Sequence, residues 1–289
     1  MIVYRFILVE KANHSIRMLC RVLKASRSAW YAWAEAQRNP DPDLTDRTRI
    51  RAAHKESRGT YGSPRVARVL RDINRKRVAR IMREEGLQGV PRRRFRGTTT
   101  DSAHTRPVAQ NLLNREFIVK APDLVWVGDI TYLPTQSGWV YLAVVIDLFS
   151  RKVVGWRIEN HMRTELCLDA FKSAVALRNP VAGLIYHSDR GSQYASAAYS
   201  NALVDLGAIQ SMSRKGNCWD NAVAESFFGT LEQELVQGRV FTSIVSARNE
   251  VSDYIHRFYN TKRLHSTNCY QSPSATESVF NQALEASAA

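Results

Sequence analysis

The chain has 289 residues, of which 41 are Lys or Arg and 27 are Asp or Glu, giving a net charge of +14 and a sequence pI ≈ 9.9. This length suits about two domains, and 44% hydrophobic against 24% charged residues excludes a chain that is disordered throughout. The sequence lacks an apolar run of ~18 residues, a secretory signal and any CxxC pair, so we expect a cytoplasmic protein with no membrane partner, zinc site or disulfide framework.

The positive charge is concentrated in the first part of the chain. Residues 1–115 hold 26 Lys or Arg against 10 Asp or Glu, a net charge of +16, whereas residues 116–289 have a net charge of −2. This asymmetry indicates a segment that holds a polyanion, followed by a segment that acts on it. A basic surface without any partner is the alternative.

Short amphipathic helices are predicted throughout residues 1–96. One helix is expected at 15–23, another follows Ser26 or Ser28, and a third has Ser63 as its N-cap and extends to Asp72. Next comes a helix that Asn74 caps and that Gly86 ends. The tight link and the basic second helix predict a helix-turn-helix-like DNA-binding region, with a purely structural helical bundle as the alternative.

Cations in and after this second helix are the predicted DNA contacts. Such side chains hold DNA through its phosphates without reading its sequence. The polar residues 97–120 that follow are predicted to be a linker. The predicted contacts are Lys76, Arg77, Arg80, Arg83, Arg92, Arg93, Arg94 and Arg96.

A mixed α/β domain is predicted over residues 121–240. Three strands joined by short turns lead into strands that alternate with helices, which predicts a mixed five-stranded sheet flanked by helices. This order of elements resembles the ribonuclease H-like fold, and residues 241–289 are predicted to form a C-terminal helical extension. The expected strands are 125–133, 139–146, 152–158, 183–187 and 209–212, and the expected helices are 164–177, 195–206 and 221–235.

Three acids in this domain come from three different elements. Asp129 lies inside an apolar strand, Asp189 follows the end of another strand, and Glu225 lies on a helix. Taken singly, Asp189 is explained as a turn residue and Glu225 as an ordinary helix acid. If the three converge, mutual repulsion raises their pKa values unless a cation neutralises them, and oxygen ligands favour magnesium or manganese. Two such ions can catalyse attack on a phosphodiester.

Five segments of the sequence resemble the DDE catalytic domain of bacterial insertion-sequence transposases, which are related to retroviral integrases. The similarity is to the insertion sequence three family. The acids agree with it in spacing, since sixty positions separate the first two and thirty-five residues lie between the last two. The segments are Trp126–Tyr132, Tyr141–Arg151, His187–Gly191, Asp220–Gly229 and Tyr259–Ser266.

The resemblance implies a transposase that cuts at the ends of its element and transfers the freed 3′-hydroxyl to another phosphodiester. It implies that Asp129, Asp189 and Glu225 are the catalytic residues and the ligands of two magnesium or manganese ions. It also implies DNA as the partner, both element ends and target, and a homo-oligomer on that DNA. An upstream-frame product, as partner or fusion, and a nucleoid-associated place in the bacterial cytoplasm are further expectations.

One position departs from the family pattern. Glu232 stands where the family usually has Lys or Arg, two helical turns after the catalytic Glu, and Arg214 and Lys215 are the expected substitutes in contacting DNA. This departure keeps two alternatives open. One is a ribonuclease H-like nuclease without joining activity, and the other is a catalytically impaired DNA-binding relic.

For several other residues we expect a structural role, or we leave two roles open. Asp147 is expected to stabilise a turn rather than bind metal, and His187 is expected to be a hydrogen-bonded residue at a strand end. Arg263 is predicted to contact DNA, with solvation of the last helix together with His265 as an equal alternative. Trp126 and Trp219 are expected in the core.

Overall fold

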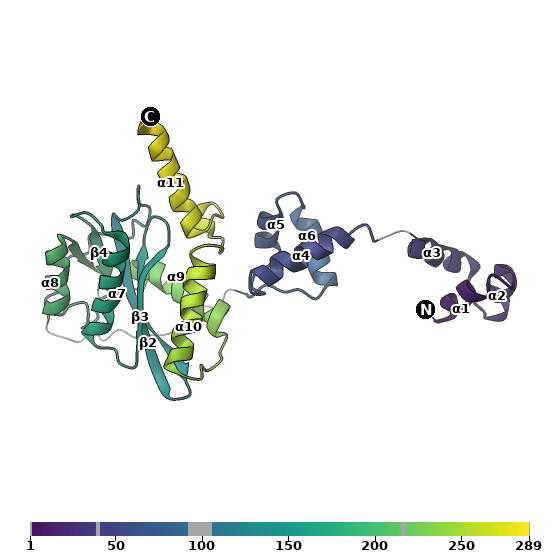
Figure 1. The fold of residues 1–289 in the computed structure, drawn as a ribbon, viewed down its shortest axis with the longest axis horizontal. Coiled ribbons are helices and arrows are strands. Elements are labelled where there is room, and N and C mark those ends of the chain that lie inside the picture. Colours follow the sequence, from purple (N-terminus) through teal and green to yellow (C-terminus); the bar gives the residue numbers. More distant parts are fainter. Residues whose placement is uncertain (1, 39–40, 92–105, 215–217, 289) are drawn as a thin grey trace.

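The computed structural model describes residues 2–38, 41–91, 106–214 and 218–288, which form two small helical units and one larger α/β unit (Figure 1). Within these ranges, no helix is both long enough and apolar enough to cross a bilayer. Some of the predicted DNA contacts lie outside the described residues, namely Arg92, Arg93, Arg94, Arg96 and Lys215.

The first helical unit consists of α1 (Ile2–Glu10), α2 (Ile16–Val22) and α3 (Arg27–Arg38). Ser15 caps α2, because its side chain accepts a hydrogen bond from the Met18 N–H, and α3 follows Ser26 as expected. The unit has a small core of its own, formed by Ile7, Leu19, Cys20 and Trp30.

The second helical unit consists of α4 (Leu44–Glu56), α5 (Ser63–Leu70) and α6 (Arg75–Glu84). The side chain of Asn74 caps α6 as predicted, accepting the Lys76 N–H at 2.8 Å. The expected start and end of α5 are each wrong by one or two residues. Gly62 is the N-cap instead of Ser63, and the helix ends at Leu70 because Arg71 has a positive φ of 49°.

The α/β unit is built on five strands in the order β3-β2-β1-β4-β5. The first three strands are antiparallel, whereas β4 runs parallel to β1 and β5 runs parallel to β4. This confirms the predicted mixed sheet and gives β1 a hydrogen-bonded neighbour on both sides. The strands are β1 (Val125–Thr135), β2 (Gly138–Asp147), β3 (Val153–Glu159), β4 (Ile185–Ser188) and β5 (Ile209–Met212).

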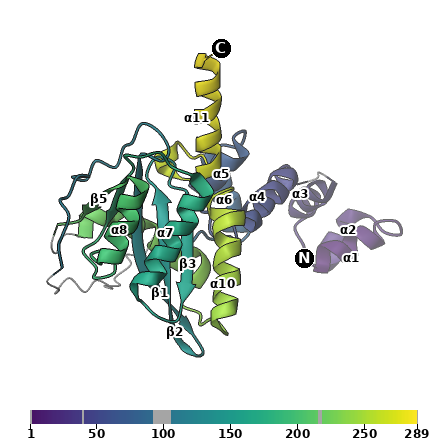
Figure 2. The same ribbon diagram turned by 60° about the vertical axis from the view of Figure 1, so that its left-hand side comes forward.

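Helices cover both faces of this sheet (Figures 1 and 2). Side chains alternate along β1, so that Val127 packs into the core under α9 and α10 while Trp126 packs under α7 and α8. The same alternation assigns Asp129 to the face that α9 covers. The helices are α7 (Thr164–Arg178), α8 (Ala197–Leu206), α9 (Ala222–Leu231) and α10 (Ile244–Asp253).

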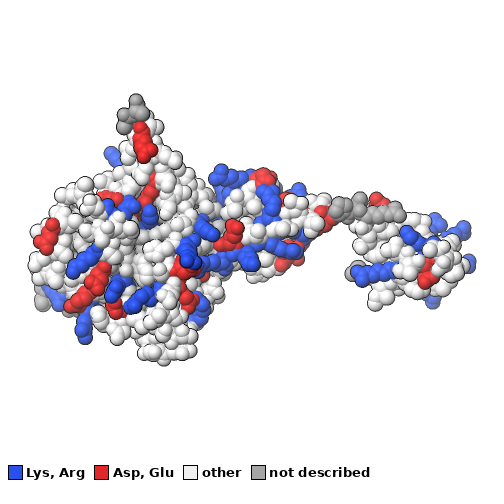
Figure 3. Space-filling view, in the orientation of Figure 1, with Lys and Arg blue, Asp and Glu red and all other residues white. Residues whose placement is uncertain are grey.

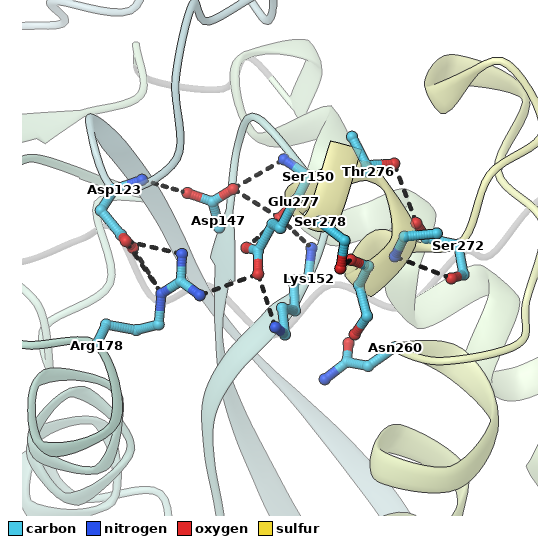
Figure 4. A network of polar contacts seen from close by, with 12 residues as sticks. Asp123, Asp147, Ser150, Lys152, Arg178, Asn260, Ser272, Thr276, Glu277 and Ser278 are labelled. Carbon is cyan, nitrogen blue, oxygen red and sulfur yellow. Dashed lines mark hydrogen bonds and ion pairs between the residues drawn. The ribbon is translucent and has the colours of Figure 1, made fainter. Parts of the chain in front are cut away.

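The C-terminal extension returns to the sheet through a polar network (Figure 4). Glu277, on α11 (Pro273–Ala288), accepts hydrogen bonds from Ser150 Oγ at 3.0 Å, Lys152 Nζ at 2.7 Å and Arg178 Nη1 at 3.0 Å. The buried Asp147 carboxylate accepts the N–H and Oγ–H groups of Ser150, so Asp147 stabilises the turn after β2, as expected. The network thus joins α11 to that turn and to the end of α7.

The packing of α7 on β3 depends on Gly155. A Cβ atom at this position would lie 2.3 Å from the Ala170 carbonyl oxygen and 2.7 Å from the Ala174 Cβ. We therefore expect Gly155→Ala to push α7 away from the sheet and to lower the free energy of unfolding by about 1–3 kcal/mol in urea titrations. The control Lys172→Ala, on the exposed side of the same helix, should stay within about 0.5 kcal/mol of the parent. Equal effects of the two substitutions would contradict this account.

Candidate active site

Asp129 lies in the middle of β1, opposite Val144 of β2. Its side chain is partly exposed, and its Oδ1 accepts the N–H of Ile130 at 2.8 Å. Burial among protein atoms, together with the charges of Asp189 and Glu225, raises the pKa of Asp129 well above its usual range. Three carboxyl groups from distant parts of the chain therefore share one electrostatic environment.

Asp189 follows β4 directly. Because β4 is the parallel neighbour of β1, with Ser188 in register with Gly128, the end of β4 lies beside Asp129. The Asp189 Oδ1 accepts the Gly191 N–H at 2.9 Å, which holds the carboxylate in the turn after the strand. Of the two acids that raise the pKa of Asp129, Asp189 has the larger effect.

Glu225 lies in the first turn of α9 and is exposed. The neighbouring Phe227 and Phe228 are buried and pack α9 onto the core that β1 shares. Partial desolvation raises the pKa of Glu225. Among the described residues, its carboxylate has no hydrogen-bond partner, so no contact there fixes its orientation.

The chemistry of these donors fits a hard divalent cation. In the described part of the chain, no three His, Cys, Asp or Glu side chains lie close enough together to share a metal ion as they stand. However, Asp129 is destabilised by both neighbouring acids, and a cation among them would offset that repulsion. An all-carboxylate set without His or Cys suits magnesium or manganese.

Asp220, which sequence reasoning left without a role, anchors the approach to α9. It is fully buried, and its carboxylate accepts hydrogen bonds from Arg214 Nε at 2.9 Å, Arg115 Nε at 3.0 Å and Asn111 Nδ2 at 2.9 Å. These donors hold its pKa well below the usual range. The sequence contained one indication that Asp220 matters, since it begins the family-like segment Asp220–Gly229. Its partners Asn111 and Arg115 are too far away in sequence to have been recognised.

Arg214 therefore has a structural partner. Its guanidinium and its backbone N–H both bond to Asp220, which lies five residues before Glu225. Arg214 was expected to replace the missing cation at position 232 in contacting DNA. In this conformation its hydrogen-bonding capacity is directed at a buried carboxylate instead, although the side chain is half-exposed.

His187 is part of the frame around Asp189. It is buried, with Nδ1 2.9 Å from Ser211 Oγ and Nε2 3.1 Å from the Asp220 carbonyl oxygen. Burial lowers the pKa of His187 to about 4. This is the hydrogen-bonded strand-end histidine that was expected. Trp126 is in the core, as expected, whereas the side chain of Trp219 lies outside the described residues.

The predicted contacts on α6 are all exposed, and Lys and Arg side chains gather over the second helical unit (Figure 3). Two of the four are engaged in ion pairs. Arg77 Nη2 lies 2.8 Å from carboxylate oxygens of both Asp43 and Asp46, and Arg80 Nη2 lies 2.6 Å from Asp43. In the described ranges the other two cations, on the same helix, have no ion pair. These two are Lys76 and Arg83.

The expectations for Arg263 and His265 are not supported by their positions. Both side chains are buried, and Arg263 Nε donates to the Glu234 carboxylate at 2.8 and 3.0 Å. Glu234 also accepts the hydroxyl of Tyr254 at 2.8 Å. Arg263 therefore neither solvates the last helix nor presents its charge on the surface, because a buried carboxylate requires it.

Glu232 begins the π-helical segment η2 (Glu232–Val236) that continues α9. Partial desolvation raises the pKa of Glu232, while a hydrogen bond from the Gly238 N–H opposes this shift. Glu232 thus contacts the backbone of the turn after η2, at the position where the family usually has a cation.

Comparison with known proteins divides the chain in a similar way. Residues 41–95 match the HTH-like domain family, and residues 119–218 and 206–273 match integrase core domain families. The Transposase InsF for insertion sequence IS3A of Escherichia coli (strain K12) is 40% identical over 275 residues, which covers 91% of this chain and 94% of the relative.

A second relative, the transposase for insertion sequence element IS904 of Lactococcus lactis, is 43% identical over 231 residues, covering 78% of this chain and 90% of the relative. Among solved structures, the HTLV-2 integrase catalytic core domain in complex with magnesium is similar with 16% identity and a TM-score of 0.43. That match covers 54% of this chain and 97% of the solved chain.

Burial of His187 predicts a pH-dependent stability. An unfolded histidine has a pKa of about 6.5, so below that pH the unfolded chain binds a proton that His187 does not bind until about pH 4. The stabilisation is complete above about pH 6.5 and is lost as the pH falls towards 4, by about 3 kcal/mol in total. The free energies of unfolding of the parent and of His187→Asn, measured by urea titration, should therefore approach each other by about 1.4 kcal/mol per pH unit as the pH falls across this window. Parallel pH profiles would contradict the assignment.

The burial and repulsion of Asp129 predict that a neutral substitution and a bound metal ion each raise the Tm. Without metal, Asp129→Asn should melt at a higher temperature than the parent, because a neutral amide replaces a buried carboxyl group that two acids repel. Millimolar magnesium should raise the Tm of the parent by several degrees and leave that of Asp129→Asn unchanged. The control Asp169→Asn, an exposed acid on α7, should respond like the parent. An equal rise in all three proteins would show that the ion binds elsewhere.

Proposed function

This chain belongs to the IS3 family of insertion-sequence transposases, and we propose that Asp129, Asp189 and Glu225 are the residues with which it cleaves and joins DNA strands. The main support for this proposal is the position of Asp189 at the end of β4, beside Asp129 on β1, together with the raised pKa of Asp129. Burial is the largest cause of that shift, and the charges of Asp189 and Glu225 add to it. Carboxylates that destabilise one another in a folded protein are typical of sites that bind cations or transfer protons.

The three acids differ in how firmly the fold holds them. Asp129 is fixed by its pairing with Val144 of β2, directly after the last β1 residue that pairs with β4, and Asp189 is held in its turn by the Gly191 N–H. Glu225 extends from a helix that is packed on the sheet, and we propose that its side chain turns towards the two aspartates when a cation binds. The ions, which we propose to be two magnesium or manganese ions, activate an attacking oxygen and stabilise the leaving oxygen of a phosphodiester when bound.

DNA is the partner of this family, and the helical units supply candidate contacts with it. We propose that Lys76 and Arg83 on α6 contact phosphates, since both are exposed and have no ion pair in the described ranges. Joining two element ends requires both to be held at once, so we also propose that more than one copy assembles on the DNA. We further propose that an upstream-frame product acts together with this chain, either as a separate partner or as a fusion.

The assignment of the three acids predicts the loss of both chemical steps. Asp129→Asn, Asp189→Asn and Glu225→Gln should each slow strand cleavage and strand transfer more than about a hundred-fold, since metal ions contribute several kcal/mol to such reactions. The measurement uses labelled element ends and target plasmid with magnesium, and it follows cleaved and joined products separately.

Three outcomes of that assay would count against the proposal. Asp169→Asn, the matched acid on α7, should keep parent activity, and a comparable loss in that control would point to a general effect of removing a negative charge. Unchanged activity in Asp129→Asn would remove the residue from the site. Supplying pre-cleaved ends tests joining alone, and cleavage without any joined product would identify a nuclease.

A further inference from the structure

A cavity of about 490 Å³ lies where the second helical unit, α9 and the C-terminal tail meet. We call it the arginine pocket, because three arginines from different parts of the chain line it. Arg65 comes from α5, Arg151 from the turn after β2, and Arg263 from the tail. From α9, Ser226 and Thr230 line the wall, one helical turn apart.

Positive charge exceeds negative charge in this pocket. Among the described residues of its lining, Glu234 is the acid, and it is engaged by Arg263 and by the Tyr254 hydroxyl. His265 adds no charge at neutral pH, because burial and the nearby arginines lower its pKa well below the usual range. One carboxylate thus faces three guanidinium groups, and Glu234 lies close to Arg263 at 2.8 Å but only at 3.9 Å from Arg65, so the described lining has a positive charge of about two.

Arg65 and Arg151 are only weakly engaged by the described residues. Arg151 donates from Nη2 to the Phe117 carbonyl oxygen at 2.9 Å, but its buried Nη1 has no hydrogen-bond partner among the residues that the structure describes. Arg65 lies over the ring of Tyr61, and its nearest carboxylate oxygen, on Glu234, is 3.9 Å away. A buried donor without a partner is uncommon in folded proteins and calls for an acceptor.

We propose that the arginine pocket binds a phosphate group of the DNA strand that reaches Glu225. This rests on the proposed function, because Ser226, which lines the pocket, directly follows that catalytic residue on α9. Guanidinium groups bind phosphate with two parallel hydrogen bonds, so the available donors match this ligand. The volume is in the range of pockets that hold small molecules, which leaves room for the sugar attached to the phosphate.

The pocket also explains sequence segments that the metal site does not use. Arg151 ends the Tyr141–Arg151 segment, and Arg263 and His265 belong to the Tyr259–Ser266 segment, yet none of them lies among the three acids. The fold brings the two segments together on one cavity. In this proposal Arg65 and Arg151 hold the strand, while Arg263, paired with Glu234, stabilises the wall of the cavity.

The test measures DNA binding by the full chain in EDTA, so that no cleavage occurs. The fluorescence anisotropy of a labelled duplex is followed across a series of NaCl concentrations for the parent, Arg65→Gln, Arg151→Gln and Thr230→Glu. We expect weaker binding in all three variants. The slope of log affinity against log salt should fall in magnitude by about 0.9 for each arginine lost, because one phosphate contact disappears. Arg157→Gln, an exposed arginine on β3 outside the pocket, should keep the parent slope.

Thr230→Glu guards against misfolding, since it places a negative charge in the pocket without removing a buried arginine. Unchanged slopes in both arginine variants would overturn the proposal. This would hold even if inorganic phosphate raised the Tm of the parent, because the pocket would then bind a free anion rather than DNA. A changed slope together with full activity of Asp129→Asn would leave the pocket in place and reject the proposed function. Unchanged slopes together with loss of activity in Asp129→Asn would reject the pocket and leave the proposed function in place.

Discussion

The burial of Asp129 and its repulsion by two other acids are the constraint on which the candidate site depends. Asp129 lies on β1, paired with Val144 of β2 and directly after the last residue paired with β4, so the backbone cannot carry this carboxyl group away from its neighbours. Asp189 comes to it because β4 is paired with β1, and Glu225 comes to it because buried phenylalanines pack α9 on the same face. Ordinary packing elsewhere in the domain offsets this local cost, which is the pattern expected where a site is stabilised by a ligand.

Patterns that are local in sequence predicted most of the frame. The apolar runs of β1 and β2 predicted the strands, and Asn74 and Gly86 predicted the limits of α6. The acids were recognisable because Asp129 interrupts an apolar strand. The helix α4 was not predicted individually, since it buries only Ile50 and Ala53 and therefore has a weak apolar stripe.

Interactions between distant residues were not predictable in the same way. A reading of Arg263 and His265 as surface groups was reasonable from their polarity, and it failed because Glu234, far back in the sequence, is buried beside them. Asp220 was overlooked for the same reason, since its donors include Asn111 and Arg115 from the segment before β1. A buried ion pair is specified by two positions at once, and neither position reveals its partner.

The network at Glu277 has a consequence for how the protein is made. Its donors, Ser150, Lys152 and Arg178, are translated long before the glutamate that binds them. The end of β2 and the end of α7 therefore emerge from the ribosome without the side chain that links them, and this link closes only after synthesis has passed residue 277.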